Sequence, residues 1–274
     1  MLTRWLRLFT ERRIFMPVGP DDLVLDVGCG DKPHWRADVL VDKYLGEQYS
    51  AQRNRGGAVE PILPLFETGL ERLPFADHSF DFVYCSHVLE HVEDPRGCFE
   101  EMVRVAKRGY IEVPFVGLQK IYDQETHLWY CDDQNGGLTF TAKQEMDFDH
   151  DIIRFLRRGA LRYYAFAMNF CPEATMIRLT WDSASPPPVT VRGTPNLELV
   201  DALPRDQASV LGTPRVWSVL RSLLRLRYRR RLRRAPVMYN DIMRPELRLD
   251  EDRPLTAQVW QVDFGSTTPA SAGS

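Results

Sequence analysis

The chain has 274 residues, 44% of them hydrophobic and 27% charged, and a formal net charge of −3. This is the composition of a globular protein large enough to bury a full core. No stretch approaches the roughly 20 uninterrupted apolar residues of a membrane-spanning helix, and arginines interrupt the apolar positions near the N-terminus, so we expect neither a transmembrane segment nor a signal peptide. We therefore expect a cytoplasmic protein.

The five cysteines are odd in number and widely spaced, with no CxxC pair. This spacing indicates neither a disulfide framework nor a structural zinc site. We expect the cysteines to be reduced thiols.

The first part of the chain alternates strand and helix patterns. Apolar runs predict buried parallel strands at residues 23–27, 39–41, 80–85 and 110–113. Asp94 and Pro95 mark the start of a helix, which we expect Gly109 to end. This order predicts an α/β fold with a doubly wound, mostly parallel sheet.

The pattern changes after Pro114. The sequence NGG lies between strand patterns at 128–131 and 138–141, which predicts a hairpin; a helical pattern near 150–168 and the strand MIRLTW follow. We divide the chain into an N-terminal helix (1–20), a core with a hairpin or lid insertion (21–182), a linker or loop (183–215), a basic helix with a C-terminal α+β extension (216–263) and a disordered tail (264–274).

A glycine turn follows the first predicted strand. LDVGCG at residues 25–30 contains Asp26, Gly28 and Gly30, and Asp42 closes the second strand. In a doubly wound sheet these residues converge on the crevice at the carboxyl ends of the strands, where ligands bind. The glycines allow close approach of a ligand, and an acid at the second strand end can accept both hydroxyls of a ribose.

The third glycine of a dinucleotide fingerprint is absent. In GxGxxG it would stand at Pro33, and a proline provides neither the close helix packing nor the free N–H groups that hold a pyrophosphate. The turn therefore favours a ribose-bearing ligand without a pyrophosphate. A nicotinamide-linked reductase becomes the least favoured of the enzyme interpretations.

Two further motifs follow the glycine turn and Asp42: LPFADHSFD at residues 73–81 and CSHVLEHV at 85–92. Together and in this order, the motifs resemble those of the class I S-adenosylmethionine-dependent methyltransferases, in particular the methyltransferase type 11 group. The resemblance covers about residues 21–114. It implies S-adenosylmethionine as the cofactor, with its methionine part at the glycine turn and its ribose at Asp42. The cofactor-binding residues that we predict are Asp26, Gly28, Cys29, Gly30, Asp42, Lys43, Leu70, Glu71, Ser86 and His87.

Two features depart from the family pattern. Gly69 stands where family members carry an acid for the adenine amino group, so either Glu67 or Thr68 replaces it or backbone and stacking contacts hold the adenine. The path from Gly30 to Val39 is also too short for the usual first helix. We interpret this shortening as a subfamily trait.

His87, Glu90 and His91 have the spacing that would place them on one face of a helix. A histidine here can be the general base that takes a proton from a substrate hydroxyl or amine. The HxxEH spacing is also similar to the ExxEH metal ligands of ubiquinone-pathway O-methyltransferases, and a purely structural role is the third interpretation. We predict these three residues as catalytic and predict no metal, although positioning alone can supply much of the rate of methyl transfer.

Two further segments have candidate functional roles. His127, Trp129 and Tyr130 follow the last predicted core strand, where a lid would contact the substrate, although a structural hairpin explains them as well. The segment 214–234 has nine arginines and no acid, and a basic amphipathic helix of this kind suits an anionic membrane surface. Docking of that helix on the protein's own acidic surface is the alternative.

The sequence thus predicts a methyltransferase that acts on an oxygen or nitrogen of a small-molecule acceptor, with a glycan or lipid-linked acceptor as one class. We expect no nucleic acid partner, and peripheral membrane contact only through residues 214–234. The alternative is a methyltransferase-like binding or regulatory protein without catalysis.

Overall fold

The structure is a computed structural model that describes residues 16–49, 58–121, 124, 126–145, 175–198 and 236–264, with the isolated positions 151, 155, 158 and 159. Three predicted features lie wholly or largely outside the described residues: the N-terminal helix, the helical pattern near 150–168 and the arginine-rich segment. The same is true of the predicted disordered tail. Among the described residues, no helix is long and apolar enough to span a membrane.

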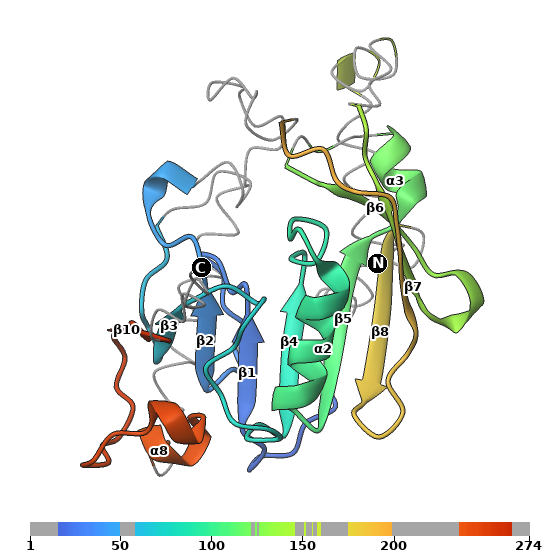
Figure 1. Ribbon diagram of the computed structural model, residues 1–274. Helices are drawn as coiled ribbons and strands as arrows, with labels where there is room; N and C mark the ends of the chain where they lie inside the picture. Colours follow the sequence, from blue (N-terminus) through green and yellow to red (C-terminus); the bar gives the residue numbers. More distant parts are fainter. Residues whose placement is uncertain are drawn as a thin grey trace, which may run out of the picture.

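A seven-stranded sheet forms the centre of the molecule (Figure 1). Its strand order is β10-β3-β2-β1-β4-β5-β8, and every pair is parallel except β5 with β8. The strands are β1 (Val24–Val27), β2 (Val39–Asp42), β3 (Leu65–Glu67), β4 (Phe82–Ser86), β5 (Arg108–Pro114), β8 (Met176–Asp182) and β10 (Val259–Trp260). This confirms the predicted α/β fold with a mostly parallel sheet, including the four strands predicted in the first half of the chain.

The central strands form because their apolar runs are buried on both faces. Every residue of β1 and β2 is buried, as expected for strands covered on both sides. In the parallel register, Asp26 of β1 lies between Leu40 of β2 and Tyr84 of β4. The carboxyl ends of β1, β2 and β4 therefore meet at one edge of the sheet.

Helix α2 (Pro95–Val105) begins as predicted and ends earlier than predicted. Asp94 caps it, since its Oδ1 accepts a hydrogen bond from the Gly97 N–H at 3.0 Å. Ala106 is already extended, and Gly109 lies inside β5, so its prediction as the helix end was wrong. A Cβ at Gly109 would lie 2.4 Å from the Trp181 ring, so close packing, rather than a helix cap, requires the glycine there.

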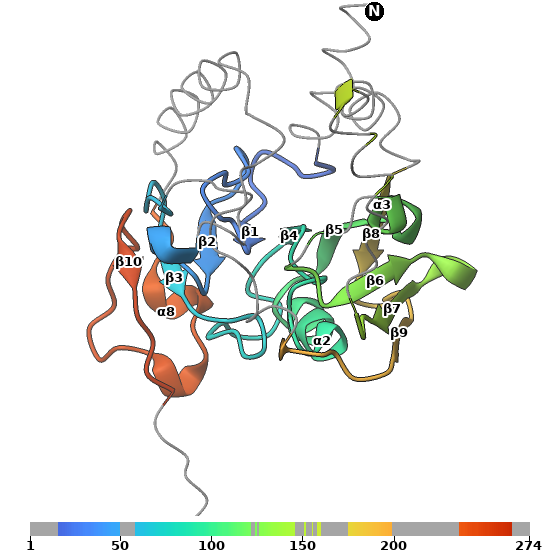
Figure 2. The same cartoon turned by 90° about the horizontal axis from the view of Figure 1, so that it is seen from above.

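A second sheet of three strands, in the order β6-β7-β9, lies on the same side of the large sheet as α2 (Figure 2). Strands β6 (Trp129–Asp132) and β7 (Leu138–Ala142) form the predicted antiparallel hairpin around the short 3-10 helix η2 (Gln134–Gly136). Helix α3 (Val116–Ile121) precedes the hairpin. Strand β9 (Val189–Arg192) pairs in parallel with β7, so the predicted linker contains a sheet strand.

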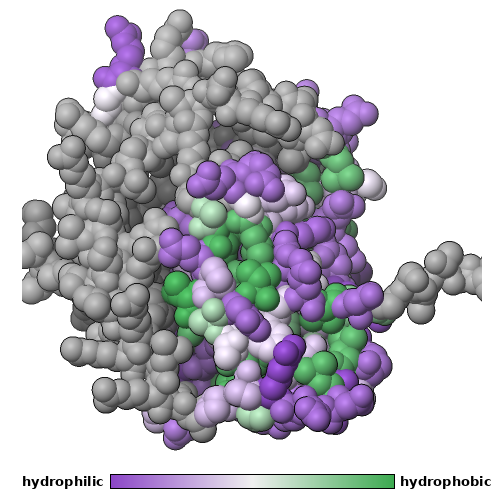
Figure 3. Space-filling model, turned by 90° about the vertical axis from the view of Figure 1, so that its left-hand side faces the viewer, coloured by the Kyte–Doolittle hydropathy of each residue, from purple (hydrophilic) through white to green (hydrophobic). Residues whose placement is uncertain are grey.

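The described part of the C-terminal extension packs against the large sheet. It comprises α8 (Tyr239–Ile242), η5 (Pro245–Leu247) and β10, which extends the sheet beside β3. The Trp260 ring stacks on Phe66 and also contacts Tyr239, with ring centroids 6.2 and 5.4 Å apart. Figure 3 shows the surface on this side, where hydrophobic residues lie among hydrophilic ones.

The connection from β1 to β2 contains only turns, with no helix between residues 31 and 38. The buried Arg36 holds this connection. Its guanidinium pairs with Asp38 at 2.9 Å and donates to the carbonyl oxygens of Gly19 and Asp22 at 2.8 and 2.7 Å. Arg36 therefore anchors this short, helix-free loop.

Candidate functional site

The glycine turn after β1 lies at the carboxyl edge of the sheet. Gly28 and Gly30 have φ angles of +64° and +53°, in the left-handed region that favours glycine. A Cβ added to Gly28 would lie 2.4 Å from Cγ2 of Val88, in the loop that follows β4. The turn and that loop are thus in close contact, and no other residue type fits at position 28 without displacing Val88.

Asp42 joins the end of β2 to this turn. Its Oδ2 accepts a hydrogen bond from the Gly30 N–H, and its Oδ1 accepts one from the Tyr44 N–H, both at 2.8 Å. These bonds fix the carboxylate beside the glycines. A carboxylate so placed fits the two hydroxyls of a ribose.

Asp26, at the end of β1, is buried. Its Oδ2 accepts a hydrogen bond from the His34 N–H at 2.6 Å. Burial raises the pKa of Asp26 to about 8, and the neighbouring charge of Asp42 also raises it, whereas the His34 N–H lowers it. A cationic group of a ligand would stabilise the ionised form, so Asp26 fits the ammonium group of a bound methionine moiety.

The predicted adenine side is less complete. Leu70 is part of the hydrophobic core, and Glu71 forms an exposed ion pair with Lys43 at 3.4 Å. Glu67, a candidate to replace the missing acid at Gly69, accepts a hydrogen bond from Gln261 beside β10 at 3.0 Å. Lys43 and Glu71 are therefore on the surface near the end of β2, and Leu70 has a packing role.

The loop after β4 carries the predicted catalytic residues, but it consists of turns and not of a helix. His87 has a φ of +57°, in the left-handed region, so the chain turns sharply directly after β4. The helical face expected for His87, Glu90 and His91 is therefore absent. The turn nevertheless brings all three side chains together.

His87 lies between two carboxyl groups. Its Nδ1 is 3.1 Å from Oε1 of Glu90, and its Nε2 is 3.4 Å from Oε1 of Glu112. Burial lowers the pKa of His87, but the contacts with Glu112 and Glu90 outweigh burial and raise it to about 9. His87 is then protonated at neutral pH, which disfavours its predicted role as a general base.

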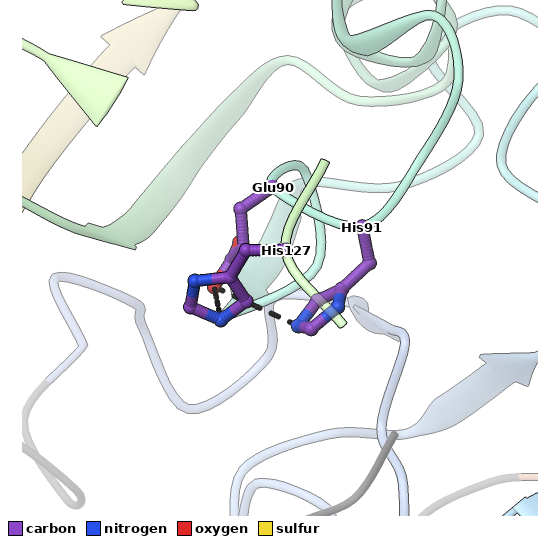
Figure 4. Close-up of side chains that lie close together, drawn as sticks. All are labelled: Glu90, His91 and His127. Atoms are coloured by element: carbon purple, nitrogen blue, oxygen red, sulfur yellow. Dashed lines mark ion pairs between the residues drawn. The ribbon is translucent and has the colours of Figure 1, made fainter. Parts of the chain in front are cut away.

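Glu90, His91 and His127 form a cluster, which we call the EHH cluster (Figure 4). Nε2 of His91 and Nε2 of His127 lie 4.0 and 3.9 Å from the same oxygen, Oε1 of Glu90. One ligand atom from each residue lies within 4.8 Å of the other two, a spacing that a metal or a small polar group would fit. Burial lowers the pKa of both histidines, so both rings are neutral at neutral pH.

The hairpin is joined to the loop after β4 by its backbone. The Leu128 N–H donates to the Glu90 carbonyl at 2.8 Å, and Nε1 of Trp129 donates to the Val92 carbonyl at 2.7 Å. Trp129 is only 1% exposed and belongs to the core, which favours the structural interpretation for this residue. Tyr130 lies next to the ammonium groups of Lys120 and Lys143, which are 4.3 and 5.6 Å from its ring centroid.

Sequence reasoning missed Glu112 and Gln119. Glu112 accepts hydrogen bonds from Ser86 Oγ at 3.2 Å and Tyr110 OH at 3.0 Å in addition to its contact with His87. It is the acid in YIEV, and a buried acid within an apolar strand is a signal that could have identified it. Gln119, in α3, contacts His127, and no sequence pattern indicates that contact.

Part of the chain is similar in sequence to known methyltransferases. Residues 25–111 match the model of a family described as methyltransferase domain. The chain is 34% identical over 101 residues to cycloartenol-C-24-methyltransferase 1 of Oryza sativa subsp. japonica, covering 34% of this chain and 29% of that protein. It is 33% identical over 106 residues to demethylmenaquinone methyltransferase of Paenarthrobacter aurescens, covering 39% and 42%.

Among solved structures, a methyltransferase from Thermotoga maritima, described as a possible histamine N-methyltransferase, is 20% identical with a TM-score of 0.31, covering 46% of this chain and 64% of that one. The chain spans less than half of the length of the curated relatives named above. Residues 25–111 are therefore similar in sequence to a methyltransferase domain, a family whose members use S-adenosylmethionine as cofactor.

Proposed function

We propose that this protein is an S-adenosylmethionine-dependent methyltransferase that acts on an oxygen or nitrogen of a small-molecule acceptor. The observation that carries the proposal is the close contact between the glycine turn and the loop after β4, where Gly28 leaves no room for a Cβ beside Val88. The contact supports the proposal because it joins the glycine turn, where the cofactor would bind, to the loop that carries His87, Glu90 and His91. A glycan or lipid-linked acceptor is the class that we would test first.

The residues of the site divide into two groups. Asp26, the glycine turn and Asp42 would hold the methionine part and the ribose of the cofactor, which supplies an activated methyl group. The loop after β4 and His127 would orient the acceptor. Because the methyl group is already activated, orientation and exclusion of water supply much of the rate, and His91 is the neutral histidine available to take a proton.

Calorimetric titration tests the cofactor part of the proposal. We expect S-adenosylmethionine and S-adenosylhomocysteine to bind at one site per chain, and NAD to give no measurable binding. Absence of binding by both sulfur nucleosides would contradict the enzyme proposal.

Turnover is tested with methyl-labelled cofactor and a panel of hydroxyl and amine acceptors that includes glycans and lipid-linked sugars. Transfer of label to any of them supports the proposal. Tight cofactor binding without transfer to any acceptor would favour the alternative of a binding or regulatory protein that has lost catalysis.

A further inference from the structure

The tautomer of His91 is set by a backbone carbonyl. Its Nδ1 lies 2.8 Å from the carbonyl oxygen of Thr126, which can only accept a hydrogen bond. Nδ1 therefore carries the proton of the neutral ring. The lone pair is on Nε2, on the side that faces Glu90.

The tautomer of His127 is opposite, and Gln119 sets it. Oε1 of Gln119 accepts from the Cys131 N–H at 2.9 Å, and Nε2 of Gln119 donates to the Trp129 carbonyl at 2.8 Å, so the amide has one orientation. The second N–H of this amide then points to Nδ1 of His127 at 3.1 Å. Nδ1 accepts, so the proton of the neutral His127 ring is on Nε2.

The EHH cluster therefore presents one acceptor and one donor. The rings of His91 and His127 are nearly perpendicular, with centroids 4.7 Å apart, and both Nε2 atoms are directed at the Glu90 carboxyl group (Figure 4). Neither Nε2 makes a hydrogen bond to a described residue. His91 is the most accessible member of the EHH cluster, with 20% of its side chain exposed, against 6% for His127 and none for Glu90, so a ligand would approach from the His91 side.

We propose that this pair recognises a hydroxyl group, so that the acceptor atom of the proposed methyltransferase is oxygen. The inference rests on the proposed function and deepens it. A hydroxyl is both donor and acceptor: its O–H can donate to Nε2 of His91 while one lone pair accepts from Nε2–H of His127. The second lone pair of the oxygen remains to attack the methyl group.

An amine does not fit the same pair. A neutral amine nitrogen has one lone pair, and accepting from the His127 N–H would leave none for attack. The spacing of the cluster suits a metal but the tautomer of His127 does not, because a ligating Nε2 of His127 would move the ring proton to Nδ1, where it would face the N–H of Gln119. The donor and acceptor arrangement thus separates oxygen from nitrogen, a choice that the sequence alone leaves open.

The proposed step transfers one methyl group to the acceptor and one proton to His91. The acceptor oxygen forms a bond to the methyl carbon as the carbon–sulfur bond breaks with its electron pair remaining on sulfur, and the hydroxyl proton passes to Nε2 of His91. The positive charge moves from the sulfonium to the imidazolium ring. In this step His91 is the catalytic base, His127 orients the acceptor, and Gln119 is a positioning residue that acts through His127.

Nitrogen NMR of histidine-labelled full-length protein, without cofactor, tests the tautomers directly. We expect His91 to carry its proton on Nδ1 and His127 to carry its proton on Nε2. Gln119→Glu replaces the amide donor by a carboxylate, which should move the His127 proton to Nδ1. Gln144→Glu, an exposed change of the same kind on the segment that follows the hairpin, should leave both tautomers unchanged. The opposite tautomer at either ring of the unmodified protein would overturn the inference.

The product tests the acceptor atom. With cofactor labelled by carbon-13 at its methyl group, NMR of the methylated product distinguishes an O-methyl group from N-methyl and C-methyl groups. An O-methyl product supports the inference, and we expect His91→Gln to lower kcat by roughly 10²–10⁴-fold while cofactor affinity stays within about threefold. An N-methyl or C-methyl product would overturn the inference and leave the proposed function intact, whereas failure to bind the cofactor would contradict the proposed function itself.

Discussion

Two residues at the carboxyl edge of the sheet have unusual charge states. Asp26 is a buried acid whose pKa is raised to about 8, and His87 is a histidine whose pKa is raised to about 9. At neutral pH the acid is largely neutral and the histidine is charged. Perturbed groups of this kind gather at functional sites, and each one gives a pH-dependent test.

Asp26→Asn should stabilise the protein without ligand. The pKa of Asp26 is higher in the folded chain than the usual value of 3.8, so its contribution to stability falls as pH rises from about 4 to about 8. Asparagine does not ionise, so the variant does not lose stability in this way as pH rises. We expect the variant to gain unfolding free energy relative to the unmodified protein, by at most about 1.4 kcal/mol for each pH unit in this range.

Urea unfolding of both proteins at pH 5 and pH 8 measures this gain, and cofactor titration measures its functional effect. Affinity should fall, because asparagine cannot present a negative charge to the ligand's ammonium group. A stability gain that is equal at the two pH values would contradict the assigned pKa.

His87→Asn tests the charged histidine. Its pKa is raised above the usual 6.5, so its favourable contribution is fully present below about pH 6.5 and is lost as pH rises through about 9. Asparagine tolerates the left-handed backbone at this position. The unmodified protein should be more stable than the variant at pH 6, and the difference should shrink by pH 9.5. Thermal unfolding of both proteins at the two pH values measures this difference in stability. A difference that does not change with pH would argue that His87 is uncharged.

At the scale of elements, the connection from β1 to β2 depends on one buried cation. Arg36 is buried, pairs with the partly buried Asp38 and donates to several carbonyls, so its removal would take the counter-ion from Asp38 and a donor from these backbone oxygens. We expect Arg36→Leu to lower the unfolding free energy by about 3–5 kcal/mol.

Lys107→Leu is the matched control for that variant. Lys107 pairs with Asp81 at 2.8 Å, but 59% of its side chain is exposed, so its removal should cost less than about 1 kcal/mol. Denaturant unfolding of the two variants compares them directly. Equal losses would show that Arg36 does not hold the loop.

The sequence predicted the elements whose physical cause is local. Strands β1 and β2 are continuous apolar runs, and the Asp94 cap with Pro95 marks the start of α2. Strand β3, of three residues, and β10, of two, are too short for a periodic signal, and they exist because neighbouring strands pair with them.

The candidate site was predictable as a list of residues and not as an arrangement. His91 and His127 are 36 positions apart and meet only because the hairpin bonds to the loop after β4. The tautomer of His127 depends on Gln119, whose orientation depends in turn on two backbone groups of β6. Tertiary contacts of this kind leave no pattern in a single sequence.

At the scale of the whole molecule, the C-terminal segment completes the sheet. Trp260 of β10 is 5% exposed and stacks on Phe66, whereas its neighbour Val259 is 38% exposed. Trp260→Ala should therefore lower the unfolding free energy by about 3–5 kcal/mol, and Val259→Ala by less than about 1 kcal/mol. If denaturant unfolding showed equally small losses for both, residues 236–264 would not contribute to the core.

The central claim is that the glycine turn binds S-adenosylmethionine, and one pair of titrations tests it most directly. Gly28→Ala and Gly136→Ala both place alanine at a positive φ, but the new Cβ lies 2.4 Å from Val88 in the first case and meets nothing within 4 Å in the second. We predict that the unmodified protein and Gly136→Ala bind the cofactor alike, and that Gly28→Ala, while still folded by circular dichroism, binds at least 10-fold more weakly. Equal affinity in all three proteins, or no binding by the unmodified protein, would contradict the claim.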